Sequence, residues 1–238
     1  MATKKKASRK AAAPAPAPVK RAKRASKKVA RSIAPAAATV VADIRRAEVV
    51  RETSETQISV RLAIDEPGYT IATGVPFLDH MLEALSRHSN IGLTVEASGD
   101  THIDDHHTVE DVGLAIGEAL RRALGDKAGL YRFGHFEAPL DEALVAVTVD
   151  LSGRPYLVYN VGLKPQRVGT FDVGLVEDFF QALMTTAGMN LHINARYGRN
   201  PHHIIEATFK AFAKSLAMAV SRDARSAGIP STKGSLDG

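Results

Sequence analysis

The stretch Asp104-Asp105-His106-His107-Thr108-Val109-Glu110-Asp111 has a counterpart in Asn200-Pro201-His202-His203-Ile204-Ile205-Glu206-Ala207. Both contain the pattern His-His-x-x-Glu, and both lead into apolar residues at helical spacing. Residues three and four apart share one face of an α-helix, so each glutamate is predicted to lie beside its histidine pair. Imidazole and carboxylate groups on one helical turn are typical of half of a transition-metal site.

Adjacent histidines point about 100° apart around a helix, so one pair rarely chelates a single ion. The pattern therefore favours two ions, each taking one imidazole from a pair, in a dinuclear site shared by two related helices. The alternative is a pair of solvated helix N-termini with capping acids. A single motif would leave these interpretations balanced, whereas its second occurrence in matching context favours the metal site.

The segments around the two motifs repeat in the same order, 96 residues apart. The first half is predicted to contain a strand, a loop that enters a helix, a strand and the first His-His helix, over 56–64, 73–85, 93–97 and 106–124. The second half is predicted to contain two strands, a helix, a strand and the second His-His helix, over 144–151, 156–159, 176–184, 191–195 and 202–220. An internal duplication is the simplest account. Because each half also carries hairpin-like strands, an α+β fold of two sheets with helices is favoured, and a single open doubly wound sheet is disfavoured.

The composition is that of a soluble globular protein, with 238 residues of which 45% are hydrophobic and 24% are charged. No apolar run approaches the length of a membrane-spanning helix, so no membrane partner is expected. The absence of cysteine excludes disulfides and thiol catalysis. It is compatible with the reducing cytoplasm, which is the predicted location.

Charge divides the chain into a tail, 1–40, and a body, 41–238. The tail holds 12 Lys+Arg and no Asp or Glu, which leaves the body 19 Lys+Arg against 26 Asp+Glu and a formal charge of −7. Self-repelling charge, Ala-Pro alternation and little apolar surface predict a disordered tail. Its function is predicted to be weak polyanion binding or mere solubilisation, and charge alone does not separate the two.

The C-terminal stretch 228–234 is short and polar, and its lysine, hydroxyls and backbone donors are suited to a phosphate group. It lacks the spacing of a Walker loop. Taken by itself, the stretch is more typical of a frayed chain end.

Seven stretches together resemble the imidazoleglycerol-phosphate dehydratase family of histidine biosynthesis, over roughly residues 47–235. They are Thr73–Met81, Asp104–Asp111, Arg132–Gly134, Pro139–Ala143, Asp150–Pro155, Asn200–Ala207 and Pro230–Gly234. Each is weak alone, but the ordered set is specific. The resemblance implies a fold like ribosomal protein S5 domain 2, in which two sheets pack with helices between them. It also implies two repeats, about 47–130 and 140–225, followed by a C-terminal substrate loop.

The resemblance further implies a monofunctional hydro-lyase. Its expected reaction converts D-erythro-1-(imidazol-4-yl)glycerol 3-phosphate to imidazole acetol phosphate and water. Two Mn(II) ions per active site and a 24-subunit assembly with sites between subunits are expected with it. Two other functions stay open: a different dinuclear-metal hydrolase on the same ligands, and a nucleic-acid-binding scaffold, which the acidic body disfavours.

The resemblance also assigns residues. The implied metal ligands are His80, His106, His107, Glu110, Asp178, His202, His203 and Glu206. The implied substrate contacts are Glu55, His88, Arg132, Arg154, Lys210, Ser231 and Lys233. The implied catalytic residues are Glu55, Glu206, His80 and Asp141, and which residue abstracts the proton is left open.

Asp178 departs from the commonest family pattern, since many members carry histidine there as a ligand and others carry an acid. It lies opposite His80 when the halves are overlaid at an offset of 98. We expect Asp178 to bind metal, although a surface carboxylate with an extra water on the ion is the alternative. His102, His135 and His192 fall outside the ligand and substrate positions that the resemblance implies, and they are expected to be structural or surface residues.

Overall fold

The computed structural model describes Met1 and residues 45–236, so the predictions about the basic tail lie outside the described residues. The first half forms a sheet of order β1-β2-β4-β3 and the second a sheet of order β5-β6-β10-β7. The first sheet comprises β1 Arg46–Glu52, β2 Thr56–Ala63, β3 Tyr69–Ala72 and β4 Gly92–Gly99. The second comprises β5 Phe133–Leu140, β6 Ala143–Asp150, β7 Tyr156–Asn160 and β10 Asn190–Tyr197.

The two sheets have the same topology. In each, an antiparallel hairpin lies beside a third antiparallel strand, and the remaining edge strand runs parallel to that third strand. The helices also correspond, with α1 Pro76–Ser89 and α2 His106–Leu124 in the first half and α3 Leu175–Ala187 and α4 Pro201–Val220 in the second. A short ribbon, β8 Arg167–Val168 and β9 Phe171–Asp172, precedes α3. The predicted α+β duplication is therefore confirmed.

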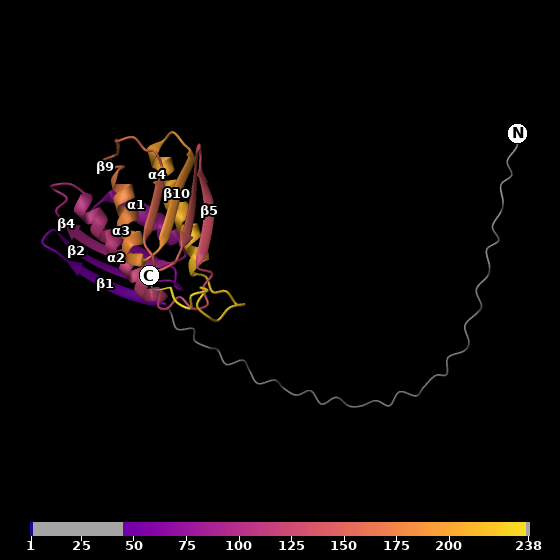
Figure 1. Ribbon diagram of the computed structural model, residues 1–238. Coiled ribbons are helices and arrows are strands. Elements are labelled where there is room, and N and C mark those ends of the chain that lie inside the picture. The colour runs from indigo at the N-terminus through magenta and orange to yellow at the C-terminus, as the bar shows by residue number, and fades with distance from the viewer. Residues whose placement is uncertain (2–44, 237–238) are drawn as a thin grey trace, which may run out of the picture. The chain divides into compact units, whose positions relative to one another are not determined.

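The four helices lie between the two sheets (Figure 1). In the first half α2 rests on β1 and β2, and in the second α4 rests on β5 and β6. The halves meet helix to helix, α2 against α3 and α1 against α4. In the helical layer, Phe180 packs against Phe209 with ring centroids 5.0 Å apart and ring planes tilted by 43°, and it meets Phe179 and Phe212 at 5.3 Å. This apolar layer fixes the relative positions of the helix ends that carry the histidine motifs.

Two glycines let α2 approach α3 closely. A Cβ atom on Gly113 would lie 2.7 Å from the carbonyl oxygen of Phe179, and one on Gly117 would collide with the Leu183 carbonyl and the Thr186 hydroxyl. That hydroxyl donates a hydrogen bond of 2.8 Å to the carbonyl of Leu114 on α2. The close contact holds the N-terminal ends of α2 and α3 side by side.

The central strands and all four helices were predicted, whereas edge strands β1, β3 and β5 were not assigned. The strand β5 starts at Phe133, so the second half includes residues before the expected boundary near 140. Among residues 45–236, the longest helices are too polar to span a lipid bilayer.

Candidate active site

Both histidine motifs begin a helix, and short polar side chains set the start. The Asp104 carboxylate accepts a 2.9 Å hydrogen bond from the backbone N–H of His106. In the second motif the Asn200 side chain accepts from the N–H of His202 at 3.0 Å, and Pro201 takes the first helical turn, where a missing N–H is tolerated. The half-buried histidines therefore lie at the N-terminal ends of α2 and α4.

The first cluster, the α1–α4 cluster, consists of His80 from α1 with His202 and Glu206 from α4. One ligand atom from each residue lies within 4.8 Å of the others. The Glu206 Oε2 atom is 3.2 Å from His202 Nε2 and 3.6 Å from His80 Nε2. Its other oxygen is 2.6 Å from Lys210 Nζ, and this pairing counteracts the burial that would otherwise raise the pKa of Glu206, leaving the pKa lowered. The cluster thus offers two imidazoles and an ionised carboxylate at one point.

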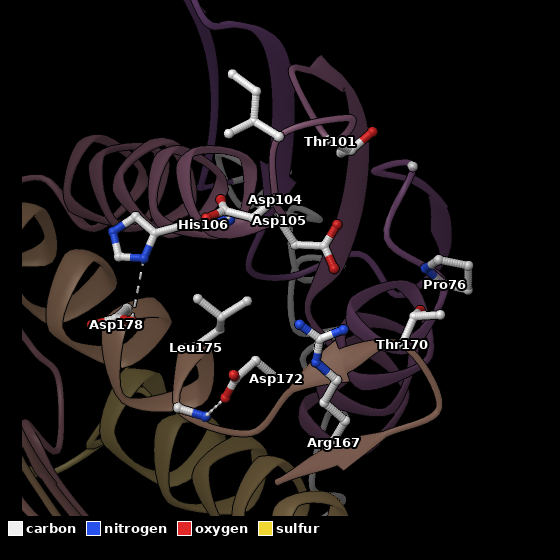
Figure 2. A pocket seen from close by; sticks show the side chains of 13 residues that line it. Pro76, Thr101, Asp104, Asp105, His106, Arg167, Thr170, Asp172, Leu175 and Asp178 are labelled. Carbon is white, nitrogen blue, oxygen red and sulfur yellow. Dashed lines mark hydrogen bonds and ion pairs between the residues drawn. The ribbon is translucent and has the colours of Figure 1, made fainter. Parts of the chain in front are cut away.

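The second cluster, the α2–α3 cluster, consists of His106 and Glu110 from α2 with Asp178 from α3. His106 Nε2 lies 3.7 Å from Glu110 Oε2, and His106 Nδ1 lies 3.6 Å from Asp178 Oδ2. Figure 2 shows the His106 ring and the Asp178 carboxylate facing each other. The duplication relates the two clusters, because Asp178 occupies on α3 the place that His80 occupies on α1. In the α1–α4 cluster the imidazole and carboxylate donors converge and suit a divalent ion such as Mn(II). In the α2–α3 cluster His106 faces the two carboxylates through opposite ring nitrogens, so each nitrogen has a carboxylate oxygen beside it.

The remaining histidine of each pair points elsewhere. The ring centroids of His106 and His107 are 6.1 Å apart and those of His202 and His203 are 6.2 Å apart, and the second histidine of each pair has partners of its own. His107 Nδ1 lies 3.0 Å from Asp100, and this hydrogen bond raises the pKa of His107. This geometry agrees with the predicted divergence of adjacent histidines.

His203 has an equivalent arrangement, with Nδ1 2.7 Å from Glu142. Their hydrogen bond raises the pKa of His203 and lowers the pKa of Glu142 to about 2. Histidines that bind a metal through one ring nitrogen commonly form a hydrogen bond to a carboxylate through the other, and this bond orients the ring. The sequence analysis assigned no role to Glu142, although it lies in one of the family stretches, and it did not identify Asp100. The only available signal was an acid at the end of a strand or turn.

The turns between hairpin strands bring the other acidic candidates near these two histidines. Glu55, in the β1–β2 turn, is 3.8 Å from His107 Nδ1. Asp141, in the β5–β6 turn, is 3.9 Å from His203 Nε2 and has a positive φ of 46°. The two turns are counterparts in the duplication, so each half presents an acid beside its outward histidine.

A cavity of about 680 Å³ opens beside the α2–α3 cluster (Figure 2). Its wall is acidic, with Asp104, Asp105, Asp172 and Asp178, and Arg167 faces them. Burial raises the pKa of Asp105. The cavity provides a negatively charged approach to the cluster, which favours a cation.

The expected substrate contacts fall into separate groups within one chain. Arg132 donates to both Asp150 carboxylate oxygens, at 2.6 and 3.0 Å, and to the Pro230 carbonyl at 2.9 Å. Arg132 therefore anchors the loop that carries Ser231 and Lys233, where the Ser231 hydroxyl accepts from the Lys233 N–H at 3.2 Å.

The other expected substrate contacts lie elsewhere. His88 is on α1 near Lys210 and Lys214, and burial followed by these cations lowers its pKa. Arg154 lies in the turn between β6 and β7. One chain thus brings Arg132 to the loop and His88 to Lys210, but it does not gather all expected contacts at one cluster.

His102, His135 and His192, which have no implied role in the site, behave as expected of surface residues. His135, on β5, pairs with the Thr148 hydroxyl at 2.9 Å. His192 is exposed on β10, and His102 is exposed in the turn before α2. Among the described residues, none of these three histidines belongs to a group of three donor atoms that lie within 4.8 Å of one another.

Fold and site together define a class of protein: a duplicated α+β sandwich that presents related imidazole–carboxylate clusters where its halves meet. Comparisons with known proteins identify the family within this class. The imidazoleglycerol-phosphate dehydratase family pattern matches residues 73–216. The dehydratase of Paracoccus denitrificans is 57% identical over 195 residues, which is 81% of this chain and all of the relative. That of Trichlorobacter lovleyi is 58% identical over 193 residues, covering 81% of this chain and 99% of the relative.

Solved structures agree. The crystal structure of the dehydratase from Staphylococcus aureus has 42% identity and a TM-score of 0.69, covering 75% of this chain and 99% of that one. The structure from Pyrococcus furiosus has 35% identity and the same TM-score, covering 79% and 99%. The chain belongs to the imidazoleglycerol-phosphate dehydratase family, whose members are hydro-lyases of histidine biosynthesis.

Proposed function

We propose that this chain dehydrates D-erythro-1-(imidazol-4-yl)glycerol 3-phosphate to imidazole acetol phosphate, using two Mn(II) ions per active site. The observation that carries the proposal is the pair of clusters related by the duplication, each with imidazole and carboxylate donors from two helices. Membership of the family supports the proposed reaction and substrate. A cytoplasmic location stays a prediction.

The donor set suits Mn(II), because carboxylate oxygens and imidazole nitrogens are ligands that this ion accepts. In the α1–α4 cluster the ligands would be His80, His202 and Glu206. In the α2–α3 cluster they would be His106, Glu110 and Asp178. A bound ion supplies Lewis-acid stabilisation of the charge that develops on the imidazole ring of the substrate.

The chain itself supplies groups for proton transfer and phosphate binding. Glu55 and Glu206 are the proposed proton-transfer groups, and Asp141 occupies the counterpart of the Glu55 turn. Lys210 holds one oxygen of Glu206, which keeps that carboxylate ionised and leaves its other oxygen directed at the histidines. Arg132, Arg154, Ser231 and Lys233 offer the charge-assisted donors that a phosphate requires.

His107 and His203 support sites that are completed between subunits. Each is turned away from the clusters of its own chain and held through Nδ1 by a carboxylate. We therefore assign their Nε2 atoms to clusters on other copies of the chain, within the 24-subunit assembly expected from the family resemblance. This arrangement also explains why one chain does not gather all the substrate contacts.

The test is turnover of imidazoleglycerol phosphate by protein stripped of metal with a chelator and then titrated with Mn(II). We expect activity to return with two ions per subunit and 1,2,4-triazole compounds to inhibit it. Activity no higher than that of the stripped protein would exclude the proposal. Release of inorganic phosphate without dehydration, unaffected by triazoles, would instead support the alternative dinuclear-metal hydrolase.

A further inference from the structure

A buried carboxylate, Asp111, lies on α2 four residues after His107 and immediately after Glu110. It is only 7% exposed. Its Oδ1 atom accepts a 2.8 Å hydrogen bond from Arg51 Nε, and its Oδ2 atom accepts one of 2.6 Å from the Thr56 hydroxyl. Arg51 lies at the end of β1 and Thr56 at the start of β2, so Asp111 ties both sides of this hairpin to the helix.

The hydrogen bonds continue into the turn that carries Glu55. The Thr53 hydroxyl lies 3.2 Å from that of Thr56 and accepts from the backbone N–H of Glu55 at 3.1 Å and of Thr56 at 2.9 Å. The Glu55 carbonyl accepts from the N–H of Asp100 at 3.2 Å. The turn is thus fixed on both sides, and the Glu55 carboxylate is held 3.8 Å from His107 Nδ1.

The second half shows that the fold does not itself require this carboxylate. At the motif offset of 96 residues, the counterpart of Asp111 is Ala207, which is fully buried. The counterpart turn is held differently, by Glu142, which accepts from the backbone N–H groups of Arg199 and Asn200 at 3.1 and 2.7 Å. Burying a carboxylate carries a desolvation cost that alanine avoids. The first half bears this desolvation cost at Asp111, beside the turn that places Glu55.

We infer that Asp111 is a positioning residue of the reaction, which sets Glu55 against His107 through Thr56, Thr53 and Arg51. The inference rests on the proposed function, in which Glu55 is a proton-transfer group. Proton transfer demands hydrogen-bond reach to the reacting atom, and a displacement of about 1 Å can cost about a hundredfold in rate. Asp111 would therefore affect kcat without contacting the substrate or the metal ions.

The test is a double-mutant cycle in the Mn(II)-loaded assembly. Asp111→Asn should lower kcat at least about tenfold while KM changes less than about threefold. In a Glu55→Asp background, where the carboxylate is already displaced, Asp111→Asn should lower kcat less than about threefold, because contacting and linked residues are non-additive. Thr56→Val, which removes only the hydroxyl, should show the same dependence on Glu55 and serves where Asp111→Asn folds poorly.

The control is Asp65→Asn, which breaks the ion pair of Arg45 with Asp65 at the end of the β1–β2 hairpin opposite the Glu55 turn. It should leave kcat unchanged in both backgrounds, and all variants should retain Mn(II) stoichiometry and assembly size. An unchanged kcat in Asp111→Asn, or an equal loss in both backgrounds, would overturn the inference while wild-type turnover left the proposed function standing. An inactive wild type would remove both.

Discussion

At the scale of single residues, the two adjacent histidines of one motif have different surroundings. His106 faces Glu110 and Asp178, whereas His107 is held by Asp100. The divergence was predictable, since the helical rotation between adjacent residues is fixed. The carboxylate that holds each outward histidine was not predictable. Glu142 lies 61 residues before His203, and only the folded chain brings the two together. Asp100 lies seven residues before His107, but the turn between them decides whether its side chain faces the histidine.

Asp178 permits a direct test of the α2–α3 cluster. Asp178→Ala should weaken Mn(II) binding at least about tenfold, the scale of loss seen even when a residue behind a ligand is removed. Asp178→His should restore most of the affinity, because His80 already fills the equivalent place in the other cluster. Titration of the metal-free protein measures both. The exposed neighbour Glu177 provides the control, and an Asp178→Ala protein with wild-type affinity and turnover would remove Asp178 from the site.

At the scale of elements, sequence periodicity located the strands at the centre of each sheet and missed most at the edges. The strands β2, β4, β6 and β10 have a neighbour on both sides, and each buries two or more apolar residues at alternate positions. Edge strand β1 buries only Val49 fully, and β3 has four residues, none of them buried. Edge strand β5 contains a glycine and a proline, which weaken the pattern. Such edges are specified by pairing with a neighbour, which composition does not reveal.

The close contact between α2 and α3 predicts how a substitution at Gly117 changes stability. Gly117→Ala should lower the free energy of unfolding by about 1–3 kcal/mol, because the added methyl group meets the backbone of α3, which must move. Denaturant unfolding of the metal-free protein measures this. Gly228→Ala is the matched control, since a Cβ there meets nothing within 4 Å. Equal stability of the two variants would contradict the close packing of these helices.

Acid stability depends in part on α2. Glu118 binds Arg121 and Arg122 at 2.8 and 2.7 Å, and these hydrogen bonds lower the pKa of Glu118 from 4.5 to about 2. A lowered folded-state pKa gives stability that is present above the unfolded value and is lost as pH falls through the folded value. Glu118→Gln should therefore destabilise metal-free protein at pH 6 but not near pH 2. A constant difference between the two proteins across this range would exclude the ion pair as its source.

At the scale of the whole molecule, the outward histidines should link metal to assembly. His107→Ala or His203→Ala should abolish turnover and weaken the large assembly, because metal-binding energy then no longer joins copies of the chain. Sedimentation of the Mn(II)-loaded proteins measures the size, and surface His135→Ala should behave like the wild type. A fully metallated 24-subunit particle from either first variant would contradict the proposed sharing of ligands.

The basic tail is predicted to be dispensable for turnover. The Paracoccus relative is matched over its whole length by 81% of this chain, so about a fifth of the chain, a share the size of the tail, has no counterpart there. A protein beginning at Ala42 should keep its rate and assembly size. Any polyanion affinity of the full chain should disappear with the tail and decrease with salt. Loss of most activity on truncation would show that the tail is structural.

The helix-to-helix contact between the halves also has a consequence for synthesis on the ribosome. The first sheet and α2 are complete at Leu124, yet the surface that buries Gly113 and Gly117 arrives only with α3, which ends at Ala187. At about 5–20 residues per second, the nascent first half waits several seconds with an uncovered apolar helical face. During that interval it is a substrate for chaperones and for premature association with other nascent chains.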